Sequence, residues 1–413
     1  MNAHILTIGD ELLIGQVVNT NQAFIAERLN SIGVDVAFMA TVGDTADAVL
    51  GALRTAWESA EVTVVTGGLG PTHDDITRDA LCTFFRTDLV PNEEVRRHIG
   101  ELMERRNLPW TASAENQSLV PRSAALFPNP LGTAPGLRFS GEGKTMFVLP
   151  GVPYEMKEMI DSSVVPFLAP LSGEQVIRHR TLLTTGIPES SLAAQLGDLD
   201  RLLGGALLAF LPSPTGVRLR ITVHAGSAAE SEAIVHDVEE RIRAKVSRYI
   251  YGTDDDDLET VLGRMLAERK LTIAVAESCT GGLIAHRLTN VSGSSAYFER
   301  GVVTYSDTSK TELLAVPRDT IGTHGAVSRE TALSMASGIR TAARTDIGLS
   351  TTGIAGPSGG TPSKPVGTVW IGIADAGGTL ALKFNFGEGR ARIKERASQA
   401  ALELVRRRLL RLE

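Results

Sequence analysis

The chain has 413 residues, a net charge of −7 and an apolar fraction of 43%. This length is too great for one ordinary domain, and the composition is that of a folded protein rather than a disordered one. The acidic balance argues against a nucleic-acid partner, and only two cysteines, Cys82 and Cys279, are present, which excludes a disulfide framework. We predict neither a secretory signal nor a membrane span, and therefore expect a cytoplasmic protein.

Strand and helix patterns alternate over residues 1–170. Short apolar runs predict strands at residues 34–36, 61–66 and 144–149, with a further strand ahead of residue 9, and helical patterns cover residues 21–31, 45–59, 75–85 and 152–168. This alternation predicts an α/β domain built on a mostly parallel sheet.

Three polar loops follow predicted strands of this first domain. They read GDELL at 9–13, TGGLGPTHDD at 66–75 and LPGVPYEM at 149–156, and Asn19 opens the first helix. Ligands bind open α/β sheets at the carboxyl ends of the strands, so we expect one shared site. The candidates to hold a phosphate through backbone N–H groups and side chains are Gly67, Gly68, Gly70, Thr72 and Asn19.

Several carboxylates accompany the glycine loop and are candidate ligands of a divalent cation. They are Asp10, Glu11, Asp74, Asp75 and Glu155. Hard oxygen ligands suit Mg²⁺ or a similar ion, which would fit hydrolysis of a pyrophosphate. The structural alternative is that Asp74 and Asp75 complement a helix dipole, and that His73 is an ordinary loop residue.

The pattern of polar and apolar residues changes over residues 175–252, where it predicts a small α+β connector. Strand-type alternation is found at 181–185 and 217–224, and a long amphipathic helix is predicted at 229–246. The acidic run at 254–257 marks the boundary to the third block.

Residues 258–413 predict a second, independent three-layer α/β domain. Strands are expected at 271–276, 301–305, 347–351, 366–374 and 380–385, and helices at 258–269, 282–288, 328–343 and 390–410.

The most specific motif of this domain is Ala-Glu-Ser-Cys-Thr-Gly-Gly at 276–282. It places Ser278 between a strand and a helix, where free backbone N–H groups of Thr280, Gly281 and Gly282 could stabilise an oxyanion. Taken alone, a serine in this position is more often a helix N-cap than a nucleophile, and it is the accompanying motifs that favour catalysis. Cys279 is a rival nucleophile, but no histidine partner accompanies it, and a buried structural thiol is favoured. Glu277 belongs to the same candidate site.

A serine nucleophile needs a base, and the next strand ends in Tyr-Ser-Asp-Thr-Ser-Lys at 305–310. Lys310 can be that base only if burial lowers its pKa, and Tyr305 could relay or position the proton. An isolated Lys310 would be a solvated surface residue.

A glycine-rich loop at 352–361 and a basic helix start complete the candidate site. The loop is neither a dinucleotide fingerprint nor a P-loop, but its small residues permit close approach of a phosphate or ribose. The binding candidates here are Thr352, Gly353, Ala355, Gly356, Arg390 and Lys394. For Arg390 and Arg392, the alternative to a ligand contact is a solvated position at the start of the helix.

The motifs AESCTGG, GVVTYSDTSK and TTGIAGPSGGT resemble the CinA C-terminal domain, known as nicotinamide mononucleotide deamidase, over essentially all of residues 258–413. The resemblance implies a serine nucleophile at Ser278, with Lys310 as base, Tyr305 assisting and no cofactor. The late family motif, Gly-Asp-Arg followed by Ile-Arg, here reads Gly-Glu-Gly-Arg at 387–390 and Ile-Lys at 393–394. A lysine at 394 loses the bidentate phosphate geometry of arginine.

Residues 1–170 resemble the molybdopterin-binding (MoeA/MogA-like) domain in its CinA form, which implies ADP-ribose pyrophosphatase activity with Mg²⁺, Mn²⁺ or Co²⁺. The connector resembles the family's KH-like block in its position and in its pattern of predicted strands and helices. It lacks the glycine loop of RNA-binding KH domains, so we expect a structural or dimerising role. Together the resemblances imply a homodimeric, bifunctional hydrolase of pyridine-nucleotide salvage that acts on nicotinamide mononucleotide and ADP-ribose. The alternatives are a non-catalytic competence or DNA-damage accessory protein, or a molybdopterin binder.

Overall fold

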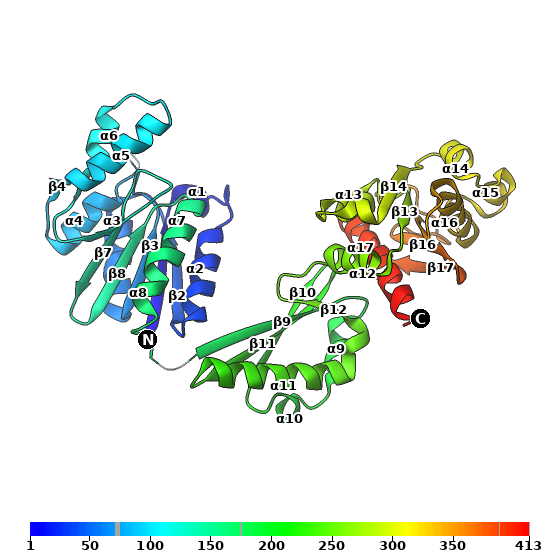
Figure 1. Ribbon diagram of the computed structural model, residues 1–413, viewed down its shortest axis with the longest axis horizontal. Coiled ribbons are helices and arrows are strands. Elements are labelled where there is room, and N and C mark those ends of the chain that lie inside the picture. The colour runs from blue at the N-terminus through cyan, green and yellow to red at the C-terminus, as the bar shows by residue number, and fades with distance from the viewer. Residues whose placement is uncertain (71–74, 174–175, 388, 413) are drawn as a thin grey trace. The chain divides into compact units, whose positions relative to one another are not determined.

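The computed structural model describes residues 1–70, 75–173, 176–387 and 389–412. The chain forms two compact units, one of residues 1–178 with 223–233 and the other of residues 179–222 with 234–413. Figure 1 shows their elements, and each unit is described by itself. Among the described residues, no helix has the length and apolar character needed to cross a membrane.

A six-stranded sheet in the order β2-β1-β3-β8-β7-β6 forms the centre of the N-terminal domain. The first four strands run parallel, whereas β7 pairs antiparallel with β8 and β6 pairs antiparallel with β7. The strands are β1 (Asn2–Ile8), β2 (Asp35–Val42), β3 (Val62–Thr66), β6 (Ala125–Phe127), β7 (Gly136–Gly141) and β8 (Lys144–Leu149). The predicted α/β class with a mostly parallel sheet is confirmed.

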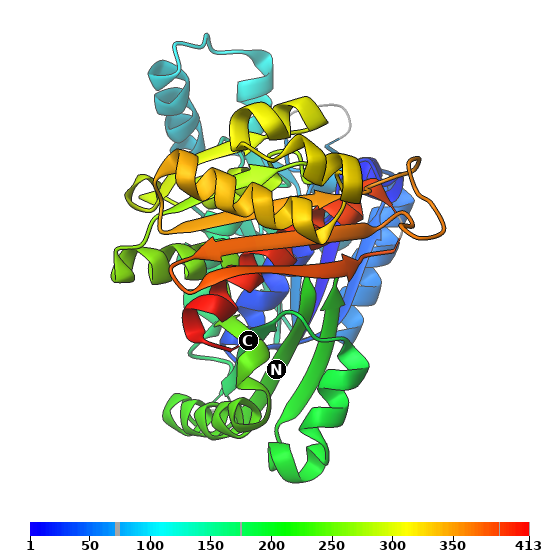
Figure 2. The same ribbon diagram turned by 90° about the vertical axis from the view of Figure 1, so that its right-hand side faces the viewer.

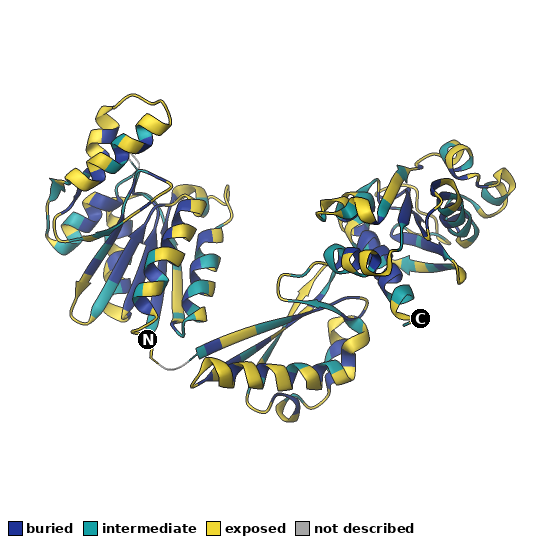
Figure 3. Ribbon diagram, viewed as in Figure 1, coloured by how far each residue is buried: buried dark blue, intermediate teal, exposed yellow. Residues whose placement is uncertain are grey.

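Helices cover both faces of this sheet and enclose two apolar cores, and Figure 3 shows the central strands as buried. The helices are α1 (Asp10–Leu13), α2 (Thr20–Ser31), α3 (Ala46–Ser59), α4 (Thr77–Phe85), α5 (Glu93–Arg105), α6 (Ala112–Gln117), α7 (Pro153–Met159) and α8 (Val165–Leu168), and a separate hairpin pairs β4 (Leu89–Pro91) with β5 (Leu119–Pro121). The helix expected at 152–168 is interrupted by a π-helical turn at Ile160–Val164. Pro166 follows this turn and has no N–H to continue the α-helical ladder.

The middle block has a four-stranded sheet in the order β10-β11-β9-β12. Its elements are β9 (Val176–Thr184), α9 (Glu189–Leu196), α10 (Leu199–Leu203), β10 (Leu207–Ser213), β11 (Gly216–Ala225), α11 (Ala228–Val246), a 3₁₀ turn (Ser247–Tyr249) and β12 (Ile250–Thr253). The two predicted strands and the long helix are present, and the strands are longer than expected. Alternate residues of β11 are buried, which agrees with the pattern on which its prediction rested.

The C-terminal domain is built on a five-stranded sheet in the order β14-β13-β15-β16-β17, in which the first three strands run parallel. Figure 2 shows this sheet with α14 to α16 (yellow) on one side and α17 (red) on the other. The elements are α12 (Leu258–Arg269), β13 (Ile273–Glu277), α13 (Leu283–Asn290), a 3₁₀ turn (Ser294–Ala296), β14 (Phe298–Val303), α14 (Asp307–Leu314), α15 (Arg318–His324), α16 (Arg329–Ala343), β15 (Ile347–Gly353), β16 (Thr368–Asp375), β17 (Gly378–Asn385) and α17 (Arg390–Leu410). Two apolar cores, one on each face, make this the expected three-layer domain.

Helix α17 also contacts the middle block. Its residues 401–406 are all buried, including the charged side chains of Glu403 and Arg406. Arg406 forms a two-pronged ion pair with Glu403, at 2.7 and 2.9 Å, and donates to the carbonyl oxygens of Ile250 (3.2 Å) and Arg248 (2.8 Å). These hydrogen bonds join the C-terminal helix to the end of the middle block, of which residues 179–222 and 234–252 share one compact unit with the C-terminal domain.

Candidate functional site

Ser278 lies in the turn that joins the carboxyl end of β13 to α13. Its N–H donates to the carbonyl oxygen of Thr351 at 3.0 Å, and its own carbonyl oxygen accepts from the N–H of Gly281 at 3.1 Å. Gly281 (φ +61°) and Gly282 (φ +92°) both adopt left-handed backbone conformations that favour glycine. The side chain of Ser278 is buried at the edge of the sheet where β13, β14 and β15 all end.

Glu277 ends β13, and its buried carboxylate holds the start of α13. Its two oxygens accept the N–H groups of Gly282 (3.0 Å), Ile284 (3.1 Å) and Ala285 (2.8 Å). A carboxylate at a helix N-terminus satisfies otherwise unpaired donors and complements the helix dipole. Glu277 was predicted as a substrate contact, but in the structure its oxygens serve the turn that carries Ser278.

This arrangement also changes the assignment of the oxyanion donors. The N–H of Gly281 is bonded to Ser278 and that of Gly282 to Glu277, so neither is available to a ligand. Within the described residues, no protein oxygen accepts from the backbone N–H of Cys279 or of Thr280. These two N–H groups, of which only that of Thr280 was predicted, are the donors that the turn leaves open.

We expect Glu277→Ala to lower the free energy of unfolding by about 2–3 kcal/mol, because three backbone N–H groups lose their buried acceptor. Urea unfolding followed by circular dichroism measures the change. Glu395→Ala is the matched control, since Glu395 is exposed on α17. A loss for Glu277→Ala no larger than that for the control would contradict this role.

Lys310 reaches Ser278 from the first half of α14. Its ammonium nitrogen lies 3.5 Å from Ser278 Oγ and donates to the carbonyl oxygens of Thr304 (3.0 Å), Tyr305 (3.3 Å) and Ser306 (3.4 Å). The side chain is only 1% exposed, so this lysine is not the solvated surface residue that it would be in isolation. The predicted meeting of Ser278 and Lys310 is present.

Burial lowers the pKa of Lys310 below its ordinary value, while the charge of Asp307, 4.0 Å away, acts in the opposite direction. Water solvates an ammonium group better than a protein interior does, so desolvation favours the neutral amine. A neutral Lys310 amine within reach of the Ser278 hydroxyl can accept its proton.

Tyr305 is placed differently from the prediction. Strand β14 ends at Val303, so Tyr305 lies two residues beyond it, and its side chain is 60% exposed. Its phenol oxygen accepts from Arg390 Nη2 at 2.8 Å, and Arg390 Nη1 also donates to Gly356 O at 2.9 Å. In the described part of the chain, the phenol forms no hydrogen bond with Ser278 or Lys310; Tyr305 supports the lysine through its backbone carbonyl instead.

The glycine-rich loop and the start of α17 border the same sheet edge. Thr352 is buried and donates to Ala326 O at 2.7 Å, Ala355 belongs to the apolar core, and Gly353 is half-buried. Lys394 lies over the turn, since a Cβ added to Gly281 would be 3.4 Å from its ammonium nitrogen. Gly356, Arg390 and Lys394 are therefore brought to the site. Arg392 is exposed and, in the described part of the chain, forms no hydrogen bond with the residues of the site.

Cys279 does not have the environment of a nucleophile. Its side chain is buried in the apolar core of the domain. Burial raises the pKa of the Cys279 thiol to about 12. A thiol with so high a pKa is almost entirely protonated near neutral pH, which agrees with the favoured structural role.

The glycine loop of the N-terminal domain is packed tightly between β1 and α4. A Cβ at Gly67 (φ +116°) would lie 2.2 Å from Ile8 O, and one at Gly68 (φ +63°) would lie 2.2 Å from Thr77 Oγ1. The N–H of Gly70 donates to Asp75 Oδ1 at 2.8 Å. Helix α4 begins at Thr77 rather than at residue 75, so Asp75 holds the loop from a position ahead of the helix.

Other predicted residues of this domain have partners of their own. Asn19 caps α2 by accepting from Gln22 N (3.2 Å), and its amide donates to Thr7 Oγ1 (2.8 Å) and Thr41 Oγ1 (3.2 Å). Glu155 is buried and accepts from Asn129 Nδ2 at 2.7 Å. Asp10 and Asp44 each accept from the other's backbone N–H, at 3.2 and 2.9 Å.

The predicted carboxylate cluster is not assembled in the described residues. No group of three or more His, Cys, Asp or Glu side chains within them could hold a metal ion. Glu11 folds back so that its carboxylate lies beside Gly9. Thr72, His73 and Asp74 lie outside the described residues. The described carboxylates therefore do not by themselves fit a metal centre.

Sequence patterns missed three buried polar residues near the glycine loop. Asn21 donates to Gly151 O at 2.8 Å, and Gln117 donates to Leu69 O at 2.8 Å. Asn21 Oδ1, Gln117 Oε1 and Arg78 Nε remain buried without a hydrogen-bond partner. All three stand among other polar residues of helices, so the sequence did not single them out.

The fold and the site define a protein of two α/β domains and a connector, with a serine–lysine pair at the strand ends of its C-terminal domain. Protein-family models match the chain in three places: "Probable molybdopterin binding domain" at residues 4–170, "Damage-inducible protein CinA KH domain" at 179–252 and "CinA C-terminal domain" at 255–409. The resemblance stated from the motifs is thus confirmed.

Relatives match over nearly the full length. A "CinA-like protein" of Salinibacter ruber is 46% identical over 411 residues, 99% of this chain and 100% of the relative, and one of Chloroherpeton thalassium is 46% identical over 415 residues, 98% and 99% of the two chains. A solved structure described as competence/damage inducible protein CihA from Agrobacterium tumefaciens is 40% identical, covers 36% of this chain and 94% of that chain, and has a TM-score of 0.35. The chain belongs to the CinA family.

Proposed function

We propose that the C-terminal domain hydrolyses the amide of nicotinamide mononucleotide to nicotinate mononucleotide and ammonia. The observation that carries the proposal is the 3.5 Å approach of the buried Lys310 amine to Ser278 Oγ, together with the lowered pKa of that lysine. The match to the CinA C-terminal domain supports the choice of substrate.

In the proposed reaction, neutral Lys310 accepts the hydroxyl proton while Ser278 Oγ attacks the carboxamide carbon. The N–H groups of Cys279 and Thr280 would donate to the oxyanion of the tetrahedral intermediate. Lys310 then returns the proton to the amide nitrogen, ammonia leaves, and an ester joins the substrate acyl group to Ser278. A water molecule gives a proton to Lys310 and attacks this ester, which releases the carboxylate product and restores the serine hydroxyl.

Two cations at the edge of the site would bind the phosphate of the substrate. Arg390 is held in place by Tyr305 and Gly356, and Lys394 lies over the turn beside Ser278. The expected relay of the proton through Tyr305 is replaced in this scheme by direct transfer through Lys310, and Tyr305 orients Arg390 instead.

Ammonia release from nicotinamide mononucleotide by the full chain, with a chelator present, tests the proposal. Turnover is expected to be unaffected by the chelator, because none of the proposed steps uses a metal. Absence of turnover would favour a binding role, such as that of a competence or DNA-damage accessory protein. A DNA-binding measurement at several salt concentrations would then test for phosphate contacts, which give a steep salt dependence.

Cys279→Ala is expected to retain the ammonia-release rate within about threefold, because the thiol packs in the core and is protonated. At pH 8 a pKa of about 12 leaves about one thiolate in ten thousand. We therefore also expect a thiol-reactive disulfide reagent to modify Cys279 only after unfolding. Loss of activity in a folded Cys279→Ala variant would make the cysteine, rather than the serine, the nucleophile.

For the N-terminal domain we propose metal-dependent hydrolysis of the pyrophosphate of ADP-ribose to AMP and ribose 5-phosphate. The match to a molybdopterin-binding domain, the glycine loop at the strand ends and the unpartnered polar atoms of Asn21 and Gln117 support a ligand site there.

We expect AMP release from ADP-ribose in the presence of Mg²⁺, Mn²⁺ or Co²⁺, and its loss on addition of a chelator. The same samples should keep releasing ammonia from nicotinamide mononucleotide, which serves as an internal control for folding. Tight binding of a pterin without AMP release would favour the molybdopterin alternative over pyrophosphate hydrolysis.

A further inference from the structure

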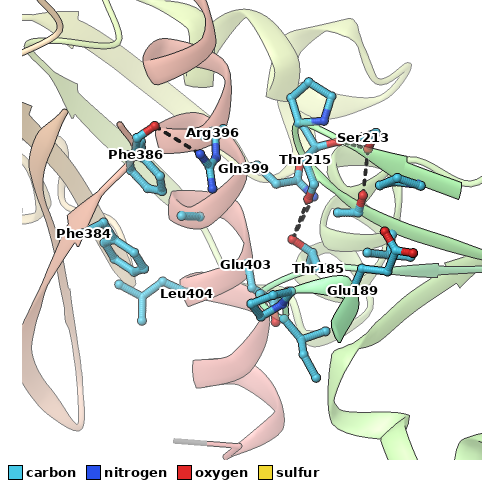
Figure 4. A pocket seen from close by; sticks show the side chains of 18 of the residues that line it. Thr185, Glu189, Ser213, Thr215, Phe384, Phe386, Arg396, Gln399, Glu403 and Leu404 are labelled. Atoms are coloured by element: carbon cyan, nitrogen blue, oxygen red, sulfur yellow. Dashed lines mark hydrogen bonds between the residues drawn. The ribbon is translucent and has the colours of Figure 1, made fainter. Parts of the chain in front are cut away.

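A cleft of about 400 Å³ lies between the middle block and the C-terminal domain, within one compact unit. Figure 4 shows Phe384, Phe386 and Leu404 on one side, with Thr185, Glu189 and Ser213 on the other. None of its lining residues belongs to the Ser278 site. Cavities of this size at domain boundaries are typical of small-molecule sites.

One wall of the cleft is flat and apolar. Leu382 and Phe384 project from the same face of β17, and Phe386, just beyond the end of the strand, lines the same wall. The rings of Phe384 and Phe386 are nearly parallel, with an interplanar angle of 8° and centroids 5.4 Å apart. Ala400 and Leu404 of α17 extend this surface. Such a surface suits the face of a planar aromatic ring.

The polar part of the same wall is positively charged. Arg396 and Arg407 lie on one stripe of α17 with Ala400 and Glu403, since these positions are three or four residues apart. Arg396 donates one Nη1 bond to Phe386 O at 3.1 Å, and its guanidinium lies 5.5 Å from the ring centroid of Phe386. Arg407 donates to Leu412 O at 3.1 Å.

Among the described residues, no acidic residue of the cleft forms an ion pair with Arg396, although the charge of Glu403 acts on Arg407 as well as on Arg406. Glu403 already accepts hydrogen bonds from Nε and Nη2 of Arg406. Glu189 lies on the opposite wall, at the start of α9. Across the described ranges, neither Arg396 nor Arg407 takes part in an ion pair with a carboxylate. Their remaining N–H groups could therefore bind an anion.

Hydrogen bonds hold the cleft in shape without a ligand. Gln399, which is buried, donates to Thr185 Oγ1 at 3.3 Å and accepts from Arg287 Nη2 at 2.8 Å. Thr185 Oγ1 in turn donates to Thr215 O at 3.0 Å, which fixes the hairpin turn on the far wall. A preformed cavity binds a ligand without the entropic cost of ordering its walls.

We infer that this cleft binds a small planar aromatic anion, with its ring against Phe384 and Phe386 and its carboxylate, sulfonate or phosphate on Arg396. This site is independent of the proposed amide hydrolysis, because it shares no lining residue with the serine–lysine pair.

Fluorescence titration of the full-length protein with 1-anilinonaphthalene-8-sulfonate tests the inference, because this probe combines a flat ring system with an anionic group. N-phenyl-1-naphthylamine, which has the same rings without the sulfonate, is the matched neutral probe. We expect saturable binding of the sulfonate, at least about tenfold weaker in Ala400→Phe, which fills the cleft, and in Arg396→Gln, which removes the charge. The neutral probe should bind more weakly and should not respond to Arg396→Gln.

Phe38→Ala is the control variant, since Phe38 is an exposed aromatic residue of the N-terminal domain. Its sulfonate affinity should equal that of the wild type. Thermal unfolding by circular dichroism verifies that each variant is folded, and Arg396→Gln keeps the test decisive if Ala400→Phe does not fold. Unchanged sulfonate binding in folded Arg396→Gln, or a loss of binding in Phe38→Ala, would overturn the assignment to this cleft.

Discussion

Replacing Ser278 by alanine is expected to lower kcat for ammonia release from nicotinamide mononucleotide by at least about 1,000-fold. The substitution removes the nucleophile, and what remains is binding and oxyanion stabilisation, which accelerate the uncatalysed reaction far less. Ser278 donates no side-chain bond needed by the turn, because its backbone N–H and carbonyl make the contacts with Thr351 and Gly281. The variant should therefore fold and bind substrate like the wild type.

A continuous ammonia assay at saturating substrate measures the loss of kcat in Ser278→Ala. Burst measurements on the wild type give the concentration of active sites. Ser292→Ala is the matched control, since Ser292 is an exposed serine after α13 and outside the site. The control should keep the wild-type rate. Retention of more than a tenth of the rate by Ser278→Ala would rule out this serine as the nucleophile.

Lys310→Met is expected to lower kcat by a similar factor, because among the described residues Lys310 is the only basic side chain that forms a hydrogen bond with Ser278 Oγ. Burial lowers the pKa of Lys310, and catalysis requires its neutral form, so the wild-type kcat/KM should rise with pH through that lowered pKa and then level off. Lys310→Arg should be equally inactive, because arginine stays charged while keeping donors for the three carbonyl oxygens. Measurement of kcat and kcat/KM between pH 6 and pH 10 for the wild type and both variants tests this role of Lys310.

The same lysine links pH to stability. Between the lowered folded pKa and the ordinary unfolded value near 10.4, the unfolded chain binds more protons than the folded one. The stability of the wild type should accordingly gain from this group as pH rises through that window, and the gain should vanish in Lys310→Met. A wild-type rate independent of pH, or an active Lys310→Arg, would remove Lys310 from the role of base.

Local patterns were sufficient to predict the strand–turn–helix unit around Ser278. The run that forms β13 and the two glycines that adopt left-handed conformations are contiguous in the sequence. Lys310 follows the next strand, β14, which pairs parallel with β13, so the sheet brings the ends of the two strands together. The alternation of short strands and helices likewise predicted both α/β domains. Strands of three residues, such as β4 and β6, carry too little periodicity to be recognised.

Residue roles that depend on distant partners could not be predicted in this way. Glu277 lies beside Ser278 in sequence, yet it bonds the first turn of α13, so its role is seen only once the helix is placed. Tyr305 was assigned to Lys310 by proximity, whereas its phenol is bonded to Arg390, 85 positions away. In the N-terminal domain, the carboxylate of Asp75 bonds a nearby N–H, as short polar side chains in loops often do.

The contacts of the last turns of α17 limit where the chain can be truncated without loss of folding. A fragment that begins at residue 254 would keep Arg406 but lose the carbonyl groups of Arg248 and Ile250 that accept from it. It would also lose the opposite wall of the cleft that Leu404 and Phe386 line. We therefore expect the smallest fragment that contains the serine–lysine pair, folds and stays soluble to begin near residue 179 and so to include the connector.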